Sequence, residues 1–218
     1  MRFLALGGIV GPVLFASVVI LCAAFRPEYS HVTQFISELG ETGGPHSFLM
    51  NVVGFLPKGL LLASFGASLA YLLPRTSLSL TAAVLIVVYG LGIAAAGLYS
   101  CDPGCPSQSL SSAATMHRLV SIVSFIAGIL GIALWGYCFR SLPAWRSLWL
   151  YSAISSGLAL VLLLVVDASA ESRAFTGVWQ RLSVATLDVW CAAVGLRAFR
   201  SSAVGSTWPN PAMERTRR

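Results

Sequence analysis

The sequence predicts an all-α, polytopic membrane protein whose six transmembrane helices form one bundle. Composition carries the first part of this prediction. Of 218 residues, 56% are hydrophobic and only 10% are charged, whereas soluble domains carry about 25% charged residues. Segment length carries the second part, because several apolar stretches reach the roughly 18 residues needed to cross a bilayer. The chain is therefore not expected to be a soluble domain with a large core.

Five strongly apolar stretches are expected to be transmembrane helices because, in lipid, a spanning segment must satisfy its own backbone hydrogen bonds. In chain order they are Phe3–Phe25, Ser47–Leu73, Leu78–Tyr99, Met116–Phe139 and Leu148–Ala168. A sixth helix, Trp179–Phe199, is less apolar because it contains Gln180, Arg181 and Asp188. We therefore predict a transmembrane domain over residues 1–200 and a disordered cytoplasmic tail over residues 201–218.

Basic residues are unevenly distributed between the two sides of this bundle. If the N-terminus is cytoplasmic, nine lie inside: Arg2, Arg75, Arg140, Arg146, Arg197, Arg200, Arg215, Arg217 and Arg218. Four lie outside: Arg26, Arg118, Arg173 and Arg181. The positive-inside rule then places both termini in the cytoplasm (N-in/C-in) of a multi-pass protein of the plasma or inner membrane. The net charge of +6 is thus a topology signal, and nucleic acid is not an expected partner.

The second predicted outer loop contains the segment CDPGC, residues 101–105. Its Pro-Gly pair is typical of a tight turn, which would bring Cys101 and Cys105 together on the oxidising side. We expect a disulfide; free or metal-binding thiols are the alternatives. Structural zinc sites usually take a second pair of ligands, and the sequence offers none beside this pair. No metal or cofactor is expected.

The fourth predicted helix carries a face of small and polar residues. Spacings of four, three, four and three residues place on one face His117, Ser121, Ser124, Gly128 and Gly131. Small residues let membrane helices approach closely, so this face should point into the bundle and direct His117 inward. The alternative is a structural role, in which a loop carbonyl binds the histidine.

Charged residues also occur at membrane depth. Arg181 and Asp188 are seven residues apart and so share a helix face, while Lys58, the only lysine, follows Pro57. An ionisable group in the membrane is costly and is normally paired inside the bundle. Lys58 is expected either to reach toward the interface or to meet an acid such as Asp188. Such a pair would be a structural salt bridge or part of a substrate or proton pathway.

Several short motifs resemble a bacterial membrane family catalogued as domain of unknown function 998. In order they are Pro27, Tyr29–Ser30, ISELG (Ile36–Gly40), Asp102–Pro103, His117 and GVWQRL (Gly177–Leu182). The resemblance covers residues 1–200 and extends more distantly to the DRAM/Sfk group, whose members are linked to lipid handling. It implies a six-helix fold with a site near the outer leaflet. Asp188 and the long tail depart from the family pattern.

A polar cluster is expected at the outer mouth of the bundle. Its predicted members are Ser37, Glu38, Asp102, His117, Gln180 and Arg181. Arg181 with His117 would suit a phosphate or carboxylate head group. Alternatively, these residues only satisfy one another and fix the helices.

The expected function is binding or handling of a membrane lipid or another amphiphile from the outer side. The alternative is an intramembrane hydrolase acting on a lipid, with His117 as base and Ser37 as nucleophile. A variant of that alternative uses a metal held by His31, His46, His117 and Asp102. Whether the chain is an enzyme, and whether it has a protein partner or forms a homo-oligomer, stays open at this point.

Reporter fusions test the predicted topology. Because basic residues gather on one side nine to four, reporters fused after Arg75 and after Arg140 should read cytoplasmic. A reporter fused at Gly43 should read external. The opposite pattern would contradict the orientation.

Overall fold

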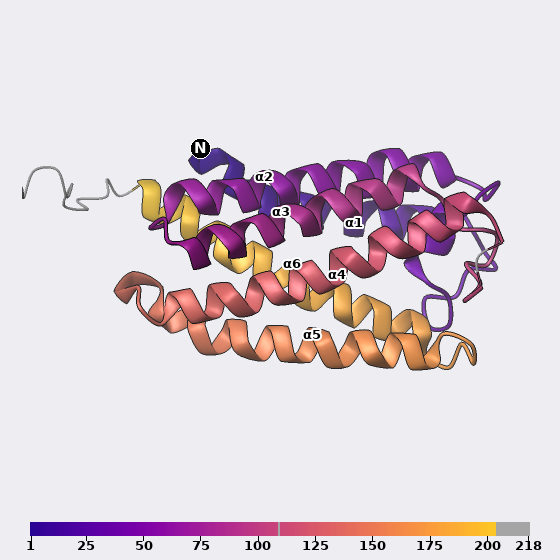
Figure 1. Cartoon of the computed structure of the whole chain (residues 1–218). Coiled ribbons are helices and arrows are strands. Elements are labelled where there is room, and N and C mark those ends of the chain that lie inside the picture. The colour runs from indigo at the N-terminus through magenta and orange to yellow at the C-terminus, as the bar shows by residue number, and fades with distance from the viewer. Residues whose placement is uncertain (109, 204–218) are drawn as a thin grey trace, which may run out of the picture.

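The computed structural model describes residues 1–108 and 110–203, and the described part is all helical. Figure 1 shows a bundle whose helices run side by side along one long axis. They are α1 (Gly7–Ala24), α2 (Leu56–Leu72), α3 (Ser77–Leu98), α4 (Ser112–Phe139), α5 (Trp149–Ser169) and α6 (Thr176–Ala203). Of the predicted tail, residues 204–218 lie outside the described residues.

Four short helical segments extend or connect these helices: η1 (Arg2–Leu6), η2 (Ile36–Gly40), η3 (Leu49–Phe55) and η4 (Pro143–Leu148). With η1, η3 and η4 added, six helices are long and apolar enough to cross a membrane. They are Arg2–Ala24, Leu49–Leu72, Ser77–Leu98, Ser112–Phe139, Pro143–Ser169 and Thr176–Ser201. The predicted six-helix membrane class is confirmed.

Two helices are longer than predicted by about a turn: α6 begins three residues earlier and ends four residues later than expected, and α4 begins four residues earlier. Helix α4 begins at Ser112 rather than Met116, because the hydroxyl of Ser111 accepts a hydrogen bond from the Ala114 amide at 3.1 Å. Such a cap satisfies one of the amides that a helix start leaves unpaired. The hydropathy pattern did not show this polar first turn.

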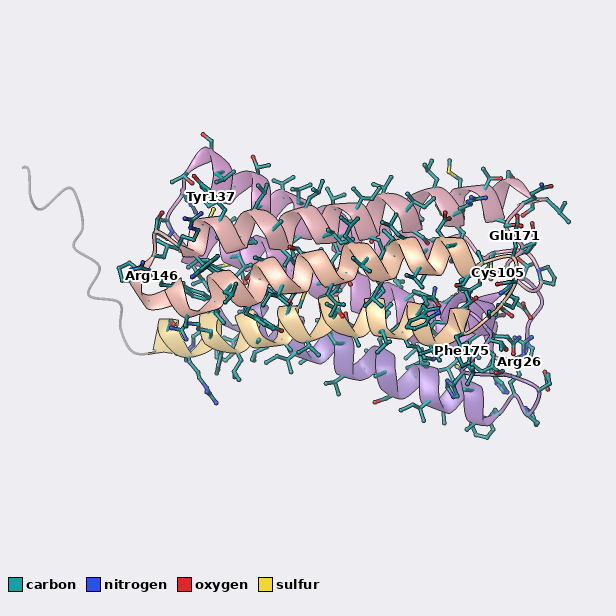
Figure 2. The ribbon with its side chains drawn as sticks, turned by 90° about the horizontal axis from the view of Figure 1, so that it is seen from below. Arg26, Cys105, Tyr137, Arg146, Glu171 and Phe175 are labelled. Carbon is teal, nitrogen blue, oxygen red and sulfur yellow. A yellow bond between two sulfur atoms is a disulfide. The ribbon has the colours of Figure 1, made fainter. Side chains whose placement is uncertain are left out.

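The two ends of the bundle differ in their connections. The long-loop end carries residues 25–48, 99–111 and 170–175, whereas the short-loop end carries residues 73–76 and 140–148. Figure 1 places the N-terminus and the last turn of α6 at the short-loop end. In Figure 2, Arg26, Cys105, Glu171 and Phe175 gather at the long-loop end, and Tyr137 and Arg146 lie at the other.

Glycines bring α2 and α3 into backbone contact. A Cβ added to Gly59 would lie 2.3 Å from the backbone nitrogen of Ala94, and one added to Gly90 would lie 2.4 Å from that of Ala63. Real Cβ atoms do not come this close to backbone, so the approach requires residues without side chains. The same device joins membrane helices in general.

The small-residue face of α4 packs against α3. The Ser124 hydroxyl donates to the Tyr89 carbonyl at 2.6 Å, and a Cβ on Gly128 would lie 3.1 Å from the Tyr89 ring. One turn further, Gly131 lies against Ile86. This face points into the bundle, as the spacing indicated.

Aromatic side chains fill the short-loop half of the bundle. Trp135 stacks on Phe139 and Phe139 on Trp145, with ring centroids 5.6 and 5.2 Å apart. Trp190 of α6 donates its indole N–H to the Ser152 hydroxyl of α5 at 2.9 Å. These aromatic layers occupy the short-loop half, and the cavity described below lies in the long-loop half.

A substitution at Gly90 tests the contact between α2 and α3. Gly90→Val puts side-chain atoms against the backbone of Ala63, which cannot move aside, so we expect destabilisation of about 1–3 kcal/mol. At about 2–4 °C per kcal/mol, thermal unfolding in detergent should begin several degrees lower. Gly157→Val is the matched control because no atom lies within 4 Å of its added Cβ. Equal stability of the two variants would contradict this packing.

Candidate functional site

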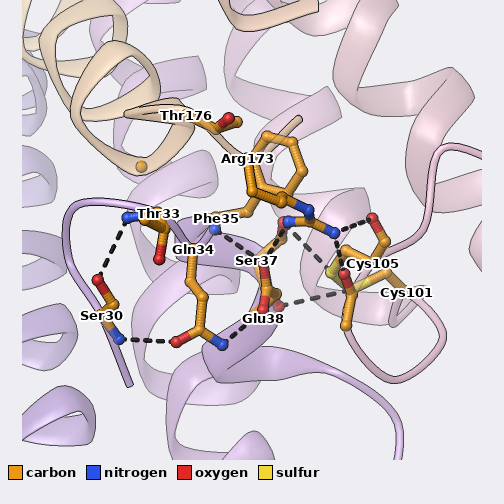
Figure 3. Close-up of polar contacts among 12 residues, drawn as sticks. Ser30, Thr33, Gln34, Phe35, Ser37, Glu38, Cys101, Cys105, Arg173 and Thr176 are labelled. Atoms are coloured by element: carbon orange, nitrogen blue, oxygen red, sulfur yellow. Dashed lines mark hydrogen bonds and ion pairs between the residues drawn. A yellow bond between two sulfur atoms is a disulfide. The ribbon is translucent and has the colours of Figure 1, made fainter. Parts of the chain in front are cut away.

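The first long loop folds over the bundle around one buried carboxylate, that of Glu38 in η2. Its side chain is 3% exposed. One carboxylate oxygen accepts from the Phe35 amide at 2.9 Å and pairs with the Arg173 guanidinium at 2.7 Å. The other accepts from the Gln34 side-chain amide at 2.7 Å (Figure 3). A buried charge needs such complete pairing.

Arg173 joins the three long-loop segments. Besides Glu38 of the first segment, its guanidinium donates to the carbonyls of Gly104 and Cys105 in the second, at 2.5 and 3.3 Å. It also lies 4.7 Å from the centroid of the Phe35 ring. Its backbone is in the left-handed region, with φ at 58°. Figure 3 shows the side chain reaching across from the third segment to the other two.

A second ion pair supports the same cap. Arg26 binds the Glu41 carboxylate at 2.7 Å and donates to the Glu38 carbonyl at 2.7 Å. The other Glu41 oxygen accepts from the Gly104 amide at 2.6 Å. The first and second long-loop segments are thus joined at several points. We call the assembly of residues 26–46, 101–105 and 173 the loop cap.

The predicted cysteine pair lies inside the loop cap. Cys101 and Cys105 are joined by a disulfide, which Figure 3 shows beside Arg173 and Ser37. The carbonyl of Cys101 accepts from the Thr42 amide at 2.9 Å. The disulfide therefore fixes the segment that Arg173 and Glu41 bind.

Arg181 and Glu38, expected to share one cluster, have different partners. Arg181 donates to the carbonyls of Gln34 and Gly177 at 3.1 and 2.8 Å and to the Tyr29 hydroxyl at 2.5 Å. Burial raises the pKa of Tyr29, and the nearby Arg181 charge opposes that shift. Among the described contacts, none joins the Arg181 guanidinium to the Glu38 carboxylate, and Arg173 takes the place predicted for Arg181.

Two other predicted residues bind backbone amides. The Gln180 side-chain oxygen accepts from the Ile36 amide at 2.6 Å, which ties α6 to η2. Asp102 accepts from the amides of Leu110 and Ser111 at 2.7 and 3.0 Å. Hydrogen bonds from the Ser111 hydroxyl and these amides hold the pKa of Asp102 below its usual value.

His117 is held by backbone carbonyls. Its Nδ1 lies 3.0 Å from the Ala96 oxygen and 2.7 Å from the Tyr99 oxygen. Because carbonyls only accept, Nδ1 carries the proton, and Nε2 is the acceptor of the neutral ring. The Ser37 hydroxyl instead lies 3.5 Å from the Cys105 sulfur. Among the contacts of the described residues, none joins Ser37 to His117 as a nucleophile and its base.

The four residues considered as metal ligands are not brought together. Each histidine ring packs on a different aromatic ring, with centroids 5.4, 5.5 and 6.5 Å apart: His31 on Tyr29, His46 on Phe25 and His117 on Phe55. Within residues 1–108 and 110–203, no three His, Cys, Asp or Glu side chains are grouped to hold a metal ion.

A cavity of about 460 Å³ lies beneath the loop cap, within the range typical of small-molecule sites. Its mouth is polar and is lined by Ser37, Asp102, His117, Arg118 and Gln180. Its walls are apolar and include Phe15, Phe55, Ile93, Phe125, Leu163 and Val184. Four of the six predicted cluster residues thus face one cavity, while Glu38 and Arg181 hold the cap in place.

The cavity reaches the surface between α4 and α5. Its lining includes Ile122 of α4, which is 44% exposed, and the exposed Asp167 of α5. Figure 1 shows these two helices close together at the short-loop end and spread apart toward the long-loop end. The opening therefore extends sideways, where a bilayer would surround the bundle, and it also reaches the long-loop end, where the lining residues Pro106, Ser107 and Glu171 are exposed.

The buried end of the cavity holds an ion pair. The ammonium of Lys58 lies 2.8 Å from one carboxylate oxygen of Asp188 and 4.1 Å from the centroid of the Phe15 ring. Lys58 is 1% exposed and lines the cavity. The sequence left two possibilities for Lys58, namely to reach toward the interface or to pair with an acid. In the structure it pairs with Asp188 inside the bundle.

The sequence did not single out Arg173 and Glu41 as parts of the site. Arg173 counts in the sequence only as one of the basic residues of the outer side, and Glu41 has no assigned role. The structure shows what the sequence does not, namely that Glu38 and Glu41 are buried. A buried acid in a loop requires a cation from another loop.

Comparison with known proteins identifies one family. A family described as "Protein of unknown function (DUF998)" matches residues 9–197. No curated protein and no solved structure matches the chain. The more distant similarity to the DRAM/Sfk group receives no support from these comparisons.

Replacing Glu38 tests the loop cap. In Glu38→Gln the side chain loses the charge that Arg173 binds, and its NH2 group replaces one carboxylate oxygen, so that donor faces donor either at Gln34 or at Phe35 and Arg173. We expect a loss of about 1.5–3 kcal/mol in the free energy of unfolding and faster reduction of the Cys101–Cys105 disulfide. Glu28→Gln is the matched control, because the Glu28 side chain is 69% exposed and should change neither quantity. Indistinguishable variants would show that Glu38 does not organise the cap.

Proposed function

We propose that this chain, which belongs to the DUF998 family of unknown function, binds a lipid or another amphiphile in the cavity beneath its loop cap. The observation that carries the proposal is the combination of a polar mouth, apolar walls and a sideways opening in one cavity. An amphiphile matches each of these features. Its apolar part would leave the bilayer between α4 and α5, and its polar part would meet fixed polar groups.

The orientation of the bundle belongs to the same proposal. The nine-to-four distribution of basic residues places the long-loop end outside the cell membrane. The disulfide at that end supports this orientation, because disulfides persist on the oxidising side of a membrane. The cavity would then receive its ligand from the outer leaflet of the plasma or inner membrane.

The contacts give no support to the hydrolase alternative. A serine hydrolase needs its nucleophile within hydrogen-bond reach of the base, and the hydroxyl of Ser37 lies against Cys105 instead. His117 is fixed by Ala96 and Tyr99. Its accepting Nε2 is suited to bind a hydroxyl or another donor of a ligand at the cavity mouth.

Filling the cavity tests the proposal. In Ser121→Phe, a ring on α4 would occupy space at a position that lines the cavity. Native mass spectrometry of protein purified in mild detergent should show bound amphiphile on the natural chain. The variant should show at least tenfold lower occupancy, which corresponds to about 1.4 kcal/mol of binding free energy.

Ser17→Phe is the matched control, because Ser17 is exposed on the outside of α1 and is not part of the cavity lining. This variant should keep its bound amphiphile. Absence of any amphiphile on the natural chain, or equal occupancy of the two variants, would contradict the proposal.

A further inference from the structure

The ion pair at the buried end of the cavity points to the class of ligand. Resting on the proposed function, we propose that the amphiphile is a carboxylic acid with an apolar body. Its carboxyl group binds the ammonium of Lys58, and one proton is taken up with it. The apolar body then extends along the cavity walls toward the opening between α4 and α5.

The ion pair is poorly explained as a stabilising device. Taking two charges out of water costs more than their attraction returns unless further hydrogen bonds satisfy them, and apolar pairs often serve stability equally well. The pair between Lys58 and Asp188 has little of that support. The second oxygen of Asp188 is buried, and its neighbour is the Tyr89 hydroxyl, with which it makes no hydrogen bond of normal geometry. Ionisable groups at membrane depth usually mark function.

The cation of this ion pair lines the cavity, and the anion does not. Lys58 lines the cavity, whereas Asp188 lies behind it. An ammonium has three N–H donors, and the described contacts use one of them, for Asp188. The remaining donors suit an oxygen acceptor on a ligand. Phe15, whose ring faces the same ammonium at 4.1 Å, also lines the cavity and would pack on the adjoining apolar segment.

Further buried polar atoms lie along the same part of the bundle. The buried hydroxyl of Ser183 has no hydrogen-bond partner among the described residues, and that of Tyr89 lies beside the Asp188 carboxylate. Ser183 lines the cavity, five residues before Asp188 on α6. Unsatisfied buried polar groups are few in native structures and need an explanation. A ligand oxygen inside the cavity would accept a hydrogen bond from the Ser183 hydroxyl and so explain why that hydroxyl has no partner in the protein.

Charge balance sets the proton stoichiometry. Lys58 and Asp188 together are neutral, so a bound carboxylate alone would leave one negative charge at membrane depth. Such a charge is expensive. Binding the carboxylate together with one proton keeps the site neutral, and the proton is shared between the ligand carboxyl and Asp188. No covalent bond forms or breaks.

The neighbours of the ion pair do not change this balance. The titratable groups nearest Asp188 are Lys58 of α2, Tyr89 of α3 and Cys191 of α6, and α1 contributes the Phe15 ring. From α4, His117 lines the mouth, and from α5, Asp167 lines the exposed rim. Phosphate and sulfonate head groups, which stay ionised near neutral pH, are therefore poor ligands for this site.

Calorimetric titration of the full chain in detergent tests this inference. Decanoic acid and its methyl ester are titrated at pH 6, 7 and 8, each in two buffers of different ionisation enthalpy. We expect uptake of about one proton per bound acid, so that its apparent Kd rises about tenfold per pH unit above the pKa of the ligand. The ester should bind without proton uptake and without pH dependence.

Two variants make the test specific. Asp188→Asn leaves Lys58 as an unpaired cation, so it should bind the carboxylate with no proton uptake and with a Kd independent of pH. Glu28→Gln, the matched control, removes a carboxylate that is 69% exposed and is not part of the cavity lining, so it should keep the proton uptake of the natural chain. If Asp188→Asn fails to fold, the double variant Lys58→Met/Asp188→Asn replaces it. That variant has no cation for the carboxylate, so it should bind the acid more weakly than the natural chain does, while its affinity for the ester should not change.

The outcomes separate this inference from the proposed function. Equal binding of acid and ester by the natural chain, or binding of the acid without proton uptake, overturns the inference and leaves amphiphile binding intact. The same holds if Asp188→Asn keeps the proton uptake. If neither compound binds and Ser121→Phe retains as much lipid as Ser17→Phe, the proposed function fails and the inference fails with it.

Discussion

The long-loop end of this protein depends on the buried carboxylate of Glu38. An ionised group removed from water must have all its acceptor positions satisfied, and Glu38 meets this condition with groups from its own loop and from Arg173. Any shift between the loops would break one of these bonds. The carboxylate therefore fixes Ser37, next to it in η2, at the cavity mouth, although Glu38 itself is not part of the lining.

The position of the cavity depends on which helices are brought into close contact by small residues. Gly59 and Gly90 bring α2 onto α3, and Ser124 and Gly128 bring α4 onto the other side of α3. Helix α4 is thereby held away from α6, with which it makes only sparse contact. At the short-loop end, aromatic rings fill the resulting space. At the long-loop end the space stays open as the cavity beneath the loop cap.

Helix-level features could be predicted from the sequence because they depend on local composition and period. The six spans follow from hydropathy, and the inward face of α4 follows from the spacing of its small residues. The ion pairs of the loops could not be predicted in the same way. Arg173 and Arg181 are eight residues apart and carry the same charge. Which of them reaches Glu38 depends on the left-handed backbone at Arg173 and Phe175, a feature that no residue pattern at these positions indicates.

The buried charges of the loop cap and the buried pair of Lys58 and Asp188 differ in how completely they are hydrogen-bonded. In the loop cap, each oxygen of Glu38 and Glu41 has a partner, and two arginines are used to provide them. At membrane depth, where an unmet bond costs more because no water can replace it, the second oxygen of Asp188 has only the Tyr89 hydroxyl beside it, without a hydrogen bond of normal geometry. This incomplete pairing lies next to Lys58, which lines the cavity, and it is there that the proposed ligand would complete the bonds.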